Sequence, residues 1–210
     1  VTYFETDLSV SVSKDSCCYE MKDLILSSIQ YYRTKIETFA SVQKDFYSAL
    51  KPIKIGSVNA LIVSEMTDAS LQTNTGPMAS VAGAFSQFIG NDILENFNTD
   101  ELIIENGGDI FLKINKDICI SIFAGESVFS EKIGIMVPAA DSPLGICTSA
   151  GTVGHSVSFG KADAVVIACK NTLLADAWAT KFANMLKKNQ ILIVLLKRFK
   201  NIKIYYHQLL

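Results

Sequence analysis

The chain has 210 residues, of which 49% are hydrophobic and 19% are charged, and its formal net charge is −2. This length suits one domain, and the apolar content excludes wholesale disorder. No acidic residue follows Asp176, whereas seven lysines and arginines do, so an acidic body carries a basic tail. Because phosphate binding needs basic charge spread over a face, the acidic body excludes a protein that coats nucleic acid.

We also expect no membrane segment and a cytoplasmic location. No uninterrupted apolar run is longer than residues 191–196, whereas a helix needs roughly 20 apolar residues to span a bilayer. The first twenty residues mix charged and apolar side chains, unlike the apolar region of a signal peptide. Five cysteines, an odd number without CxxC spacing, argue against a disulfide framework or a structural zinc site. The first residue is Val1, and the sequence does not say what precedes it.

The first half of the chain has mainly helical periodicity. Alternating residues predict a strand over residues 2–12, and apolar side chains at helical spacing then predict a long helix over residues 19–40. A short helical turn is expected over residues 44–50, and a second helix from Ser57, as its cap, to about Leu71. A turn with Pro77 at a helical first position opens a run of small residues, which lets a helix approach a sheet or a ligand closely.

The second half has the period of strands. Short strands are predicted over residues 102–105, 110–114, 118–124, 132–137, 145–148 and 164–168. Asn171 or Thr172 then caps a helix that reaches about Lys187, and residues 191–196 and 202–206 predict a final hairpin. Helices gathered early and strands gathered late favour one α+β domain over residues 1–210, with helices packed on a mainly antiparallel sheet.

The sequence Asn106-Gly107-Gly108-Asp109 lies between two predicted strands. Asn and Gly supply the positive φ of a hairpin turn, which is one interpretation. The other is a functional loop, because a backbone without side chains can closely approach a phosphate or a sugar.

Residues 148–160 form the most unusual stretch, with five hydroxyl side chains, three glycines and His155 but no formal charge. Hydroxyls, backbone N–H groups and an imidazole suit the binding of a phosphate or a carbonyl group. The alternative is a polar loop followed by a strand. The stretch matches neither the GxxxxGK[ST] phosphate loop nor the GxGxxG dinucleotide pattern.

Asp176 and Thr180 are four residues apart on a predicted helix, so they lie on the same face. A carboxylate and a hydroxyl there suit a hard cation such as Mg²⁺, which prefers oxygen ligands. The alternative is that Asp176 favours an early helical turn through the helix dipole and that Thr180 is only packed.

Several other chemistries are disfavoured. The only histidines are His155 and His207, which excludes a His-rich metal cluster. Cys147 has no histidine partner fixed by the sequence, so a cysteine nucleophile is a minor alternative. The two arginines, Arg33 and Arg198, are far from these loops in sequence. We therefore expect backbone, hydroxyls, lysine or metal to hold any phosphate, and not an arginine fork.

Four blocks follow one another in a particular order: GPMASVAGA at residues 76–84, ENGGDI at 105–110, CTSAGTVGHS at 147–156 and ADAWAT at 175–180. Together they resemble the ApbE-related group called uncharacterised protein family 0280, known mainly from archaea and anaerobic bacteria. The resemblance runs from about Tyr3 to about Leu186, and residues 188–210 depart from the usual end of the family.

The wider ApbE superfamily contains FAD:protein FMN transferases, which bind FAD and Mg²⁺ and have an α+β fold related to the T-fold. The resemblance therefore implies an ApbE-like, T-fold-related fold that binds a flavin (FAD or FMN) or a related nucleotide together with Mg²⁺. It implies that Asp176 and Thr180 ligate the metal and that His155 acts in catalysis. The residues expected in the nucleotide pocket are Ala79, Asn106, Gly107, Gly108, Asp109, Thr148, Ser149, Gly151 and Thr152.

The chain also departs from the transferases. Their HxxDPxTG block has no counterpart after His155, and Ala79 is followed by Ser80 where they carry a lysine. Whether the chain transfers a flavin or nucleotidyl group, or is an enzyme at all, is therefore left open. The nucleotide-binding pocket is still expected. The alternative is a non-catalytic accessory protein in anaerobic sulfur assimilation, in homocysteine formation, with a protein partner. Homo-oligomerisation is a further open expectation.

Overall fold

The structure is a computed structural model that describes residues 1–56, 58–150, 162–187, 191–195 and 203–206. The helices are α1 (Tyr19–Val42), α2 (Asp45–Ser48), α3 (Leu61–Thr73), α4 (Val81–Asn96) and α5 (Thr172–Met185), with short 3-10 turns at Lys14–Ser16, Pro77–Ser80 and Ala139–Asp141. The strands are β1 (Thr2–Tyr3), β2 (Thr6–Val12), β3 (Leu102–Asn106), β4 (Asp109–Lys113), β5 (Ile118–Ser121), β6 (Ile133–Val137), β7 (Leu144–Ser149), β8 (Ala164–Cys169), β9 (Ile191–Leu195) and β10 (Lys203–Tyr206).

The strands form two sheets. The larger has seven strands in the order β1-β2-β3-β4-β7-β8-β9, and the smaller has three in the order β10-β6-β5. Neighbouring strands run antiparallel except β8 and β9, which pair in parallel. The predicted α+β class with a mainly antiparallel sheet is confirmed.

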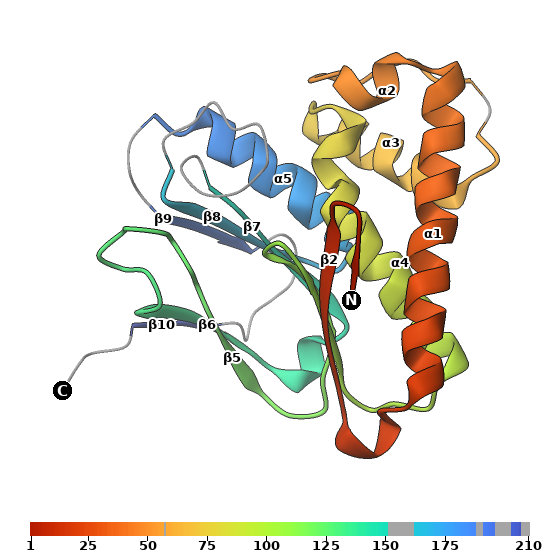
Figure 1. Cartoon of the computed structure of the whole chain (residues 1–210). Helices are drawn as coiled ribbons and strands as arrows, with labels where there is room; N and C mark the ends of the chain where they lie inside the picture. The colour runs from red at the N-terminus through yellow and green to blue at the C-terminus, as the bar shows by residue number, and fades with distance from the viewer. Residues whose placement is uncertain (57, 151–161, 188–190, 196–202, 207–210) are drawn as a thin grey trace.

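The helices cover one face of the larger sheet, and the smaller sheet lies on the other side (Figure 1). Helices α4 and α5 lie directly on the central strands, and α1 and α3 pack against these two helices. This arrangement gives the larger sheet two buried faces, each with its own apolar core.

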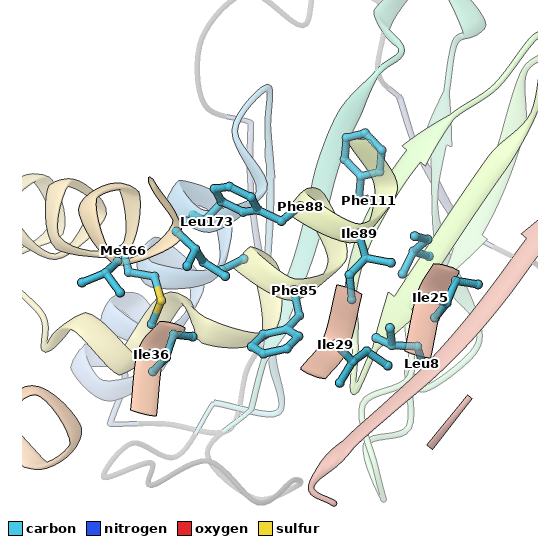
Figure 2. Close-up of a cluster of buried hydrophobic side chains, with 14 of the residues drawn as sticks. Leu8, Ile25, Ile29, Ile36, Met66, Phe85, Phe88, Ile89, Phe111 and Leu173 are labelled. Carbon is cyan, nitrogen blue, oxygen red and sulfur yellow. The ribbon is translucent and has the colours of Figure 1, made fainter. Parts of the chain in front are cut away.

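Side chains of successive residues in the central strands pack alternately into the two cores. On the helix side, Leu8 and Phe111 pack with Ile29, Phe88 and Ile89 (Figure 2). On the other side, Leu112, Ile146 and Val166 pack against Ile133 and Ile135 of the smaller sheet. Successive residues of a strand point to opposite faces, so each central strand separates two different environments.

The long helix predicted from the sequence periodicity is confirmed as α1, which extends to Val42. Met21, Ile25, Ile29 and Ile36 are buried along one face, at the three- and four-residue spacings of an amphipathic helix. Among the described residues, no helix has the combined length and hydropathy that crossing a membrane would need.

Two sequence-based predictions are wrong. The predicted final hairpin does not form, because β9 pairs with β8 in the larger sheet and β10 pairs with β6 in the smaller. An apolar run indicates a strand but says nothing about which distant strand receives it. The second helix begins at Leu61, after Ala60, and not at Ser57, which lies outside the described residues.

Candidate functional site

The turn between β3 and β4 is the tight hairpin that its sequence predicts. Gly107 and Gly108 have φ values of 62° and 100°, and Asn106 pairs with Asp109 across the strands. The Asn106 side-chain amide donates to the carbonyl oxygen of Ala82 at 3.3 Å. This bond ties the hairpin to the first turn of α4, so the turn is held against a helix N-terminus.

Asp109 points from the end of this turn toward the helices. It lies opposite Cys147 of β7, is only 7% exposed, and its backbone carbonyl accepts a 2.8 Å hydrogen bond from Ser86 Oγ. Its carboxylate oxygen Oδ1 is buried and has no hydrogen-bond partner among the described residues. Burial and then the charge of Asp176 raise the pKa of Asp109 well above its ordinary value, while hydrogen bonds from Cys147 and Thr148 lower it.

Asp176 reaches the same region from α5. It is also 7% exposed, and its Oδ2 accepts a 2.9 Å hydrogen bond from the backbone N–H of Gly83, in the first turn of α4. Burial raises the pKa of Asp176 to about 7, although the N–H groups of Gly83 and Ala82 counteract this. A helix N-terminus thus holds this carboxylate in place.

The small residues of α4 make this approach feasible. A Cβ atom on Gly83 would lie 2.6 Å from the carbonyl oxygen of Thr172 and 2.9 Å from the Asp176 Cβ. The same backbone carbonyl of Thr172 accepts a 3.4 Å hydrogen bond from the Cys147 thiol. The glycine therefore lets α4 and α5 meet closely enough for Asp176 to reach the backbone N–H groups.

The donor set fits a hard cation. Two buried carboxyl groups that repel each other, one with an unpartnered oxygen, are stabilised when a cation lies beside them. Oxygen ligands are those that Mg²⁺ prefers. Among the described residues, no group of three or more His, Cys, Asp or Glu side chains forms a metal cluster, so further ligands would be hydroxyl, carbonyl or ligand oxygens.

Two further predicted residues lie on the elements that border this pair. Thr180 is one turn after Asp176 on α5 and is partly exposed. Ala79 belongs to the 3-10 turn Pro77–Ser80, which packs against α5. The sequence predicts Asp176 and Thr180 as a pair, whereas the structure adds Asp109 as a second buried carboxylate facing α5.

The opposite face of the same strands borders a separate cavity of about 480 Å³ between the two sheets, which we call the inter-sheet cavity. Six of its sixteen lining residues are isoleucines, including Ile110, Ile120 and Ile146. Gly107, Gly108 and Thr148 also line it, and the Thr148 N–H donates to the Gly108 carbonyl at 3.1 Å.

The predicted pocket residues are therefore divided by the sheet. Asp109 faces the helices, and Thr148 lines the inter-sheet cavity, with the glycine turn at the end of the sheet where both sides meet. Ser149 is the last residue of β7 and is partly buried. Gly151, Thr152 and His155 lie outside the described residues, so their predicted roles stay predictions.

The structure also brings in residues that the sequence did not single out as site residues. Ala82, Gly83, Ser86 and Thr172 contribute backbone or hydroxyl groups around the carboxylate pair. The run of small residues after Pro77 was the available signal, but small residues serve packing as often as function.

Comparison with known sequences identifies the family. A sequence model of the family described as AbpE bacteria matches residues 1–197. The chain belongs to this family. It is also 38% identical to a protein of Methanococcus aeolicus named UPF0280 protein, over 186 residues that cover 88% of this chain and 73% of that protein.

Other relatives carry the same name. A UPF0280 protein of Methanococcus vannielii is 42% identical over 72% of this chain, and one of Methanobrevibacter smithii is 40% identical over 72%. The aligned parts take up 62% and 64% of those two proteins. The resemblance to family 0280 that the sequence blocks predict is thereby confirmed.

One solved structure shares the fold of this AbpE-family chain. The apo form of the Pseudomonas stutzeri flavinyl transferase ApbE superposes with a TM-score of 0.52 over 87% of this chain and 84% of that one. At 12% identity, this likeness supports a common fold. The ApbE-like α+β fold is confirmed, and the relation to the T-fold remains a prediction.

Proposed function

We propose that this protein binds a flavin or a related nucleotide together with Mg²⁺. The observation that carries the proposal is the buried pair of Asp109 and Asp176, one with an unpartnered oxygen, next to a glycine turn that borders a cavity. The shared fold with a protein named flavinyl transferase adds support for a flavin as the ligand.

In this proposal, Asp109, Asp176 and Thr180 hold the cation, and Ala79 lies beside it. The cation supplies positive charge that neutralises phosphate oxygens. Gly107 and Gly108 let the backbone approach the ligand, because no side chain shields the peptide groups of the turn. The N–H groups at the start of α4 keep Asp176 oriented, which fixes the carboxylate before the ligand arrives.

The inter-sheet cavity is the proposed place for an apolar ring of the ligand. Its volume of about 480 Å³ and its isoleucine walls suit a flat heterocycle, and Thr148 offers a hydroxyl at its polar side. Asn106, Ser149, Gly151 and Thr152 belong to the proposed pocket through the turn and the loop that follows β7.

The proposal concerns binding. The missing HxxDPxTG block and the serine after Ala79 separate this chain from the transferases, so flavin or nucleotidyl transfer through His155 stays a hypothesis. The test is calorimetry of the full chain with FAD, FMN and ADP, with and without Mg²⁺. We expect Mg²⁺-dependent binding of at least one nucleotide, at least tenfold weaker in Asp109→Asn and in Asp176→Asn.

The matched control is Asp23→Asn, which removes an exposed carboxylate on α1 and should bind normally. Absence of nucleotide binding, or equal binding by the two site variants, would reject the proposal. The absorption spectrum of freshly purified protein is a quicker check, because a bound flavin absorbs at about 450 nm.

The sulfur-assimilation alternative receives no support from Cys147. Burial, Asp109 and Asp176 raise the pKa of this thiol well above its ordinary value, and the thiolate is the reactive form. A sulfur-handling role would rest on the exposed Cys17, Cys18 or Cys119, or on a protein partner, and remains a prediction.

A further inference from the structure

A second cavity lies between α1 and the start of α4, on the helix side of the larger sheet. We call it the α1–α4 cavity, and its volume is about 380 Å³, within the range of small-molecule pockets. Its apolar wall is formed by Ile36, Met78, Val81 and Phe85. Figure 2 shows Phe85 extending from α4 toward α1, beside Ile29 and Ile36.

The remaining lining is polar and comes from several elements. The polar residues are Glu5, Thr6, Arg33, Glu37, Tyr47 and Asn106, and Ala82 completes the lining. An apolar wall opposite a few charged groups is typical of a site that binds an organic ion.

Arg33 is held rigidly at this cavity. Its side chain is 26% exposed, its Nη2 lies 2.7 Å from Glu5 Oε2, and its Nε lies 2.8 Å from Glu37 Oε1. Its guanidinium carbon also lies 4.9 Å from the centre of the Phe4 ring. The planar fork is therefore pre-organised for a carboxylate or a phosphate, which it recognises better than a flexible ammonium group does.

Of its two carboxylate partners, Glu5 is the easier to displace. Glu37 lies one turn along α1 from Arg33, whereas Glu5 belongs to the tip between β1 and β2, and its side chain is 79% exposed. The neighbouring Phe4 has a φ of 50°, which a bulky side chain rarely adopts. Exposed ion pairs add little to stability, so a ligand oxyanion can take the place of Glu5 at small cost.

The cavity also adjoins the candidate site. Ala82 and Asn106 line it, and the hydrogen bond between them joins the glycine turn to the helix end that holds Asp176. A molecule in the α1–α4 cavity would thus lie beside the proposed nucleotide site but on the other side of the glycine turn from the inter-sheet cavity.

We propose that the α1–α4 cavity is a second ligand site, for a small organic anion with an apolar body. The body lies on Met78, Val81 and Phe85, and the carboxylate or phosphate binds Arg33 in place of Glu5. This site shares Asn106 with the proposed nucleotide pocket, but its charged groups, Arg33, Glu5 and Glu37, are distinct from the carboxylate pair. It also brings one arginine near the predicted loops, which the sequence order did not indicate.

The test uses three probes with one ring and different head groups: naphthalene-2-carboxylate, 2-naphthyl phosphate and the neutral 2-naphthylmethanol. Calorimetry with the full chain measures each affinity. We expect one equivalent of at least one anion to bind, at least tenfold more tightly than the neutral probe. The tighter of the two anions identifies whether a carboxylate or a phosphate is the preferred head group.

Substitutions separate the roles of the two charged partners. Arg33→Met replaces the charged side chain with an uncharged one of similar length. The anion and the neutral probe should then bind with about equal affinity. Glu5→Gln removes the internal competitor, so anion binding should strengthen by about two- to fivefold. Lys35→Met, which removes a cation from α1 that packs on Tyr31 and does not line the α1–α4 cavity, is the control and should change neither value.

Three results would overturn the proposal: no binding of either anion, equal binding of the neutral probe, or an anion preference that survives in Arg33→Met. If Arg33→Met does not fold, two measurements still test the proposal. Wild type must bind an anion more tightly than the neutral probe, and Glu5→Gln must strengthen anion binding. Asp176→Asn should leave anion binding intact, so failure of this site and failure of nucleotide binding are distinguishable.

Discussion

The negative charge of Asp176 on α5 raises the pKa of Asp109 on β4, across the interface between the helices and the larger sheet. Burial is the larger cause at both residues, and it raises the pKa of Asp176 to about 7. Protonation or a neighbouring cation stabilises a buried carboxyl pair of this kind. If both groups ionise without a cation, the folded state loses stability.

Stability should therefore depend on pH when a chelator removes cations. The folded pKa of Asp176, about 7, lies above its ordinary value of 3.8, so the folded chain retains a proton that the unfolded chain has released. The free energy of unfolding should then fall as pH rises from about 4 to about 7, between the unfolded and folded pKa values of Asp176, with a slope of up to about 1.4 kcal/mol per pH unit for each retained proton. Urea unfolding at several pH values measures this slope.

Two variants isolate the contribution of Asp176. Asp176→Asn should have a shallower slope than wild type in chelator, and millimolar Mg²⁺ should flatten the wild-type curve. Asp23→Asn, an exposed site, should keep the wild-type slope. Equal slopes for wild type and Asp176→Asn would contradict the assignment of the retained proton to this carboxyl group.

Gly83→Ala should damage both stability and the site. The added Cβ would lie 2.6 Å from the Thr172 carbonyl oxygen, and backbone cannot move away as a flexible side chain can. We expect a loss of about 1–3 kcal/mol in the free energy of unfolding, as for other overpacked positions. The stabilisation by Mg²⁺ should shrink as well, because the Gly83 N–H that holds Asp176 must shift.

Gly56→Ala is the matched control, since a Cβ there meets no atom within 4 Å. Thermal and urea unfolding compare the two variants. If both variants were equally stable, the close approach of α4 to α5 would not be required.

Local features of this fold could be predicted from the sequence. The turn after Asn106 forms because its glycines adopt positive φ, and α5 begins where expected because the Asn171 side chain accepts a hydrogen bond from the Leu174 N–H at 2.8 Å. Each of these features depends on residues a few positions apart, so the pattern itself contains the physical cause.

Long-range pairings could not be predicted. The parallel pairing of β8 with β9 and the contact of Asp109 with the region of Asp176 depend on segments far apart in the chain. Nothing in the spacing near Arg33 reveals that it shares a cavity with Asn106. Such relationships arise from how amphipathic elements pack, which periodicity constrains only to a face and not to a partner.

The two glycines of the turn should differ in how they tolerate substitution. Gly107, with φ of 62°, lies in the left-handed region that Asn adopts readily, whereas Gly108 has φ of 100°. Gly107→Asn should therefore change the free energy of unfolding by less than about 0.5 kcal/mol, and Gly108→Ala should lower it by about 1–2 kcal/mol. Urea unfolding of both variants tests this difference, and an equal loss in the two would contradict it.

Replacing Glu65 on α3 should stabilise the fold. Its Oε2 is buried without a hydrogen-bond partner among the described residues, and burial and then Asp68 raise its pKa. Because the carboxylate form is disfavoured in the folded state, Glu65→Gln should raise stability at pH 8, by up to about 0.5 kcal/mol after solvent screening. The gain should vanish as pH falls and Glu65 becomes protonated, and a gain that stays constant with pH would contradict this cause.

The five thiols of this protein should differ in their reactivity. Cys17, Cys18 and Cys119 are exposed, whereas Cys147 and Cys169 are buried. An aromatic disulfide reagent should therefore react quickly with three thiols in the native protein and with five in denaturant. Because burial and two carboxyl groups raise the pKa of Cys147, Cys147→Ser should leave the fast native count at three and lower only the denatured count. A fourth fast thiol that disappears in Cys147→Ser would contradict the burial and would favour the sulfur-handling alternative over nucleotide binding.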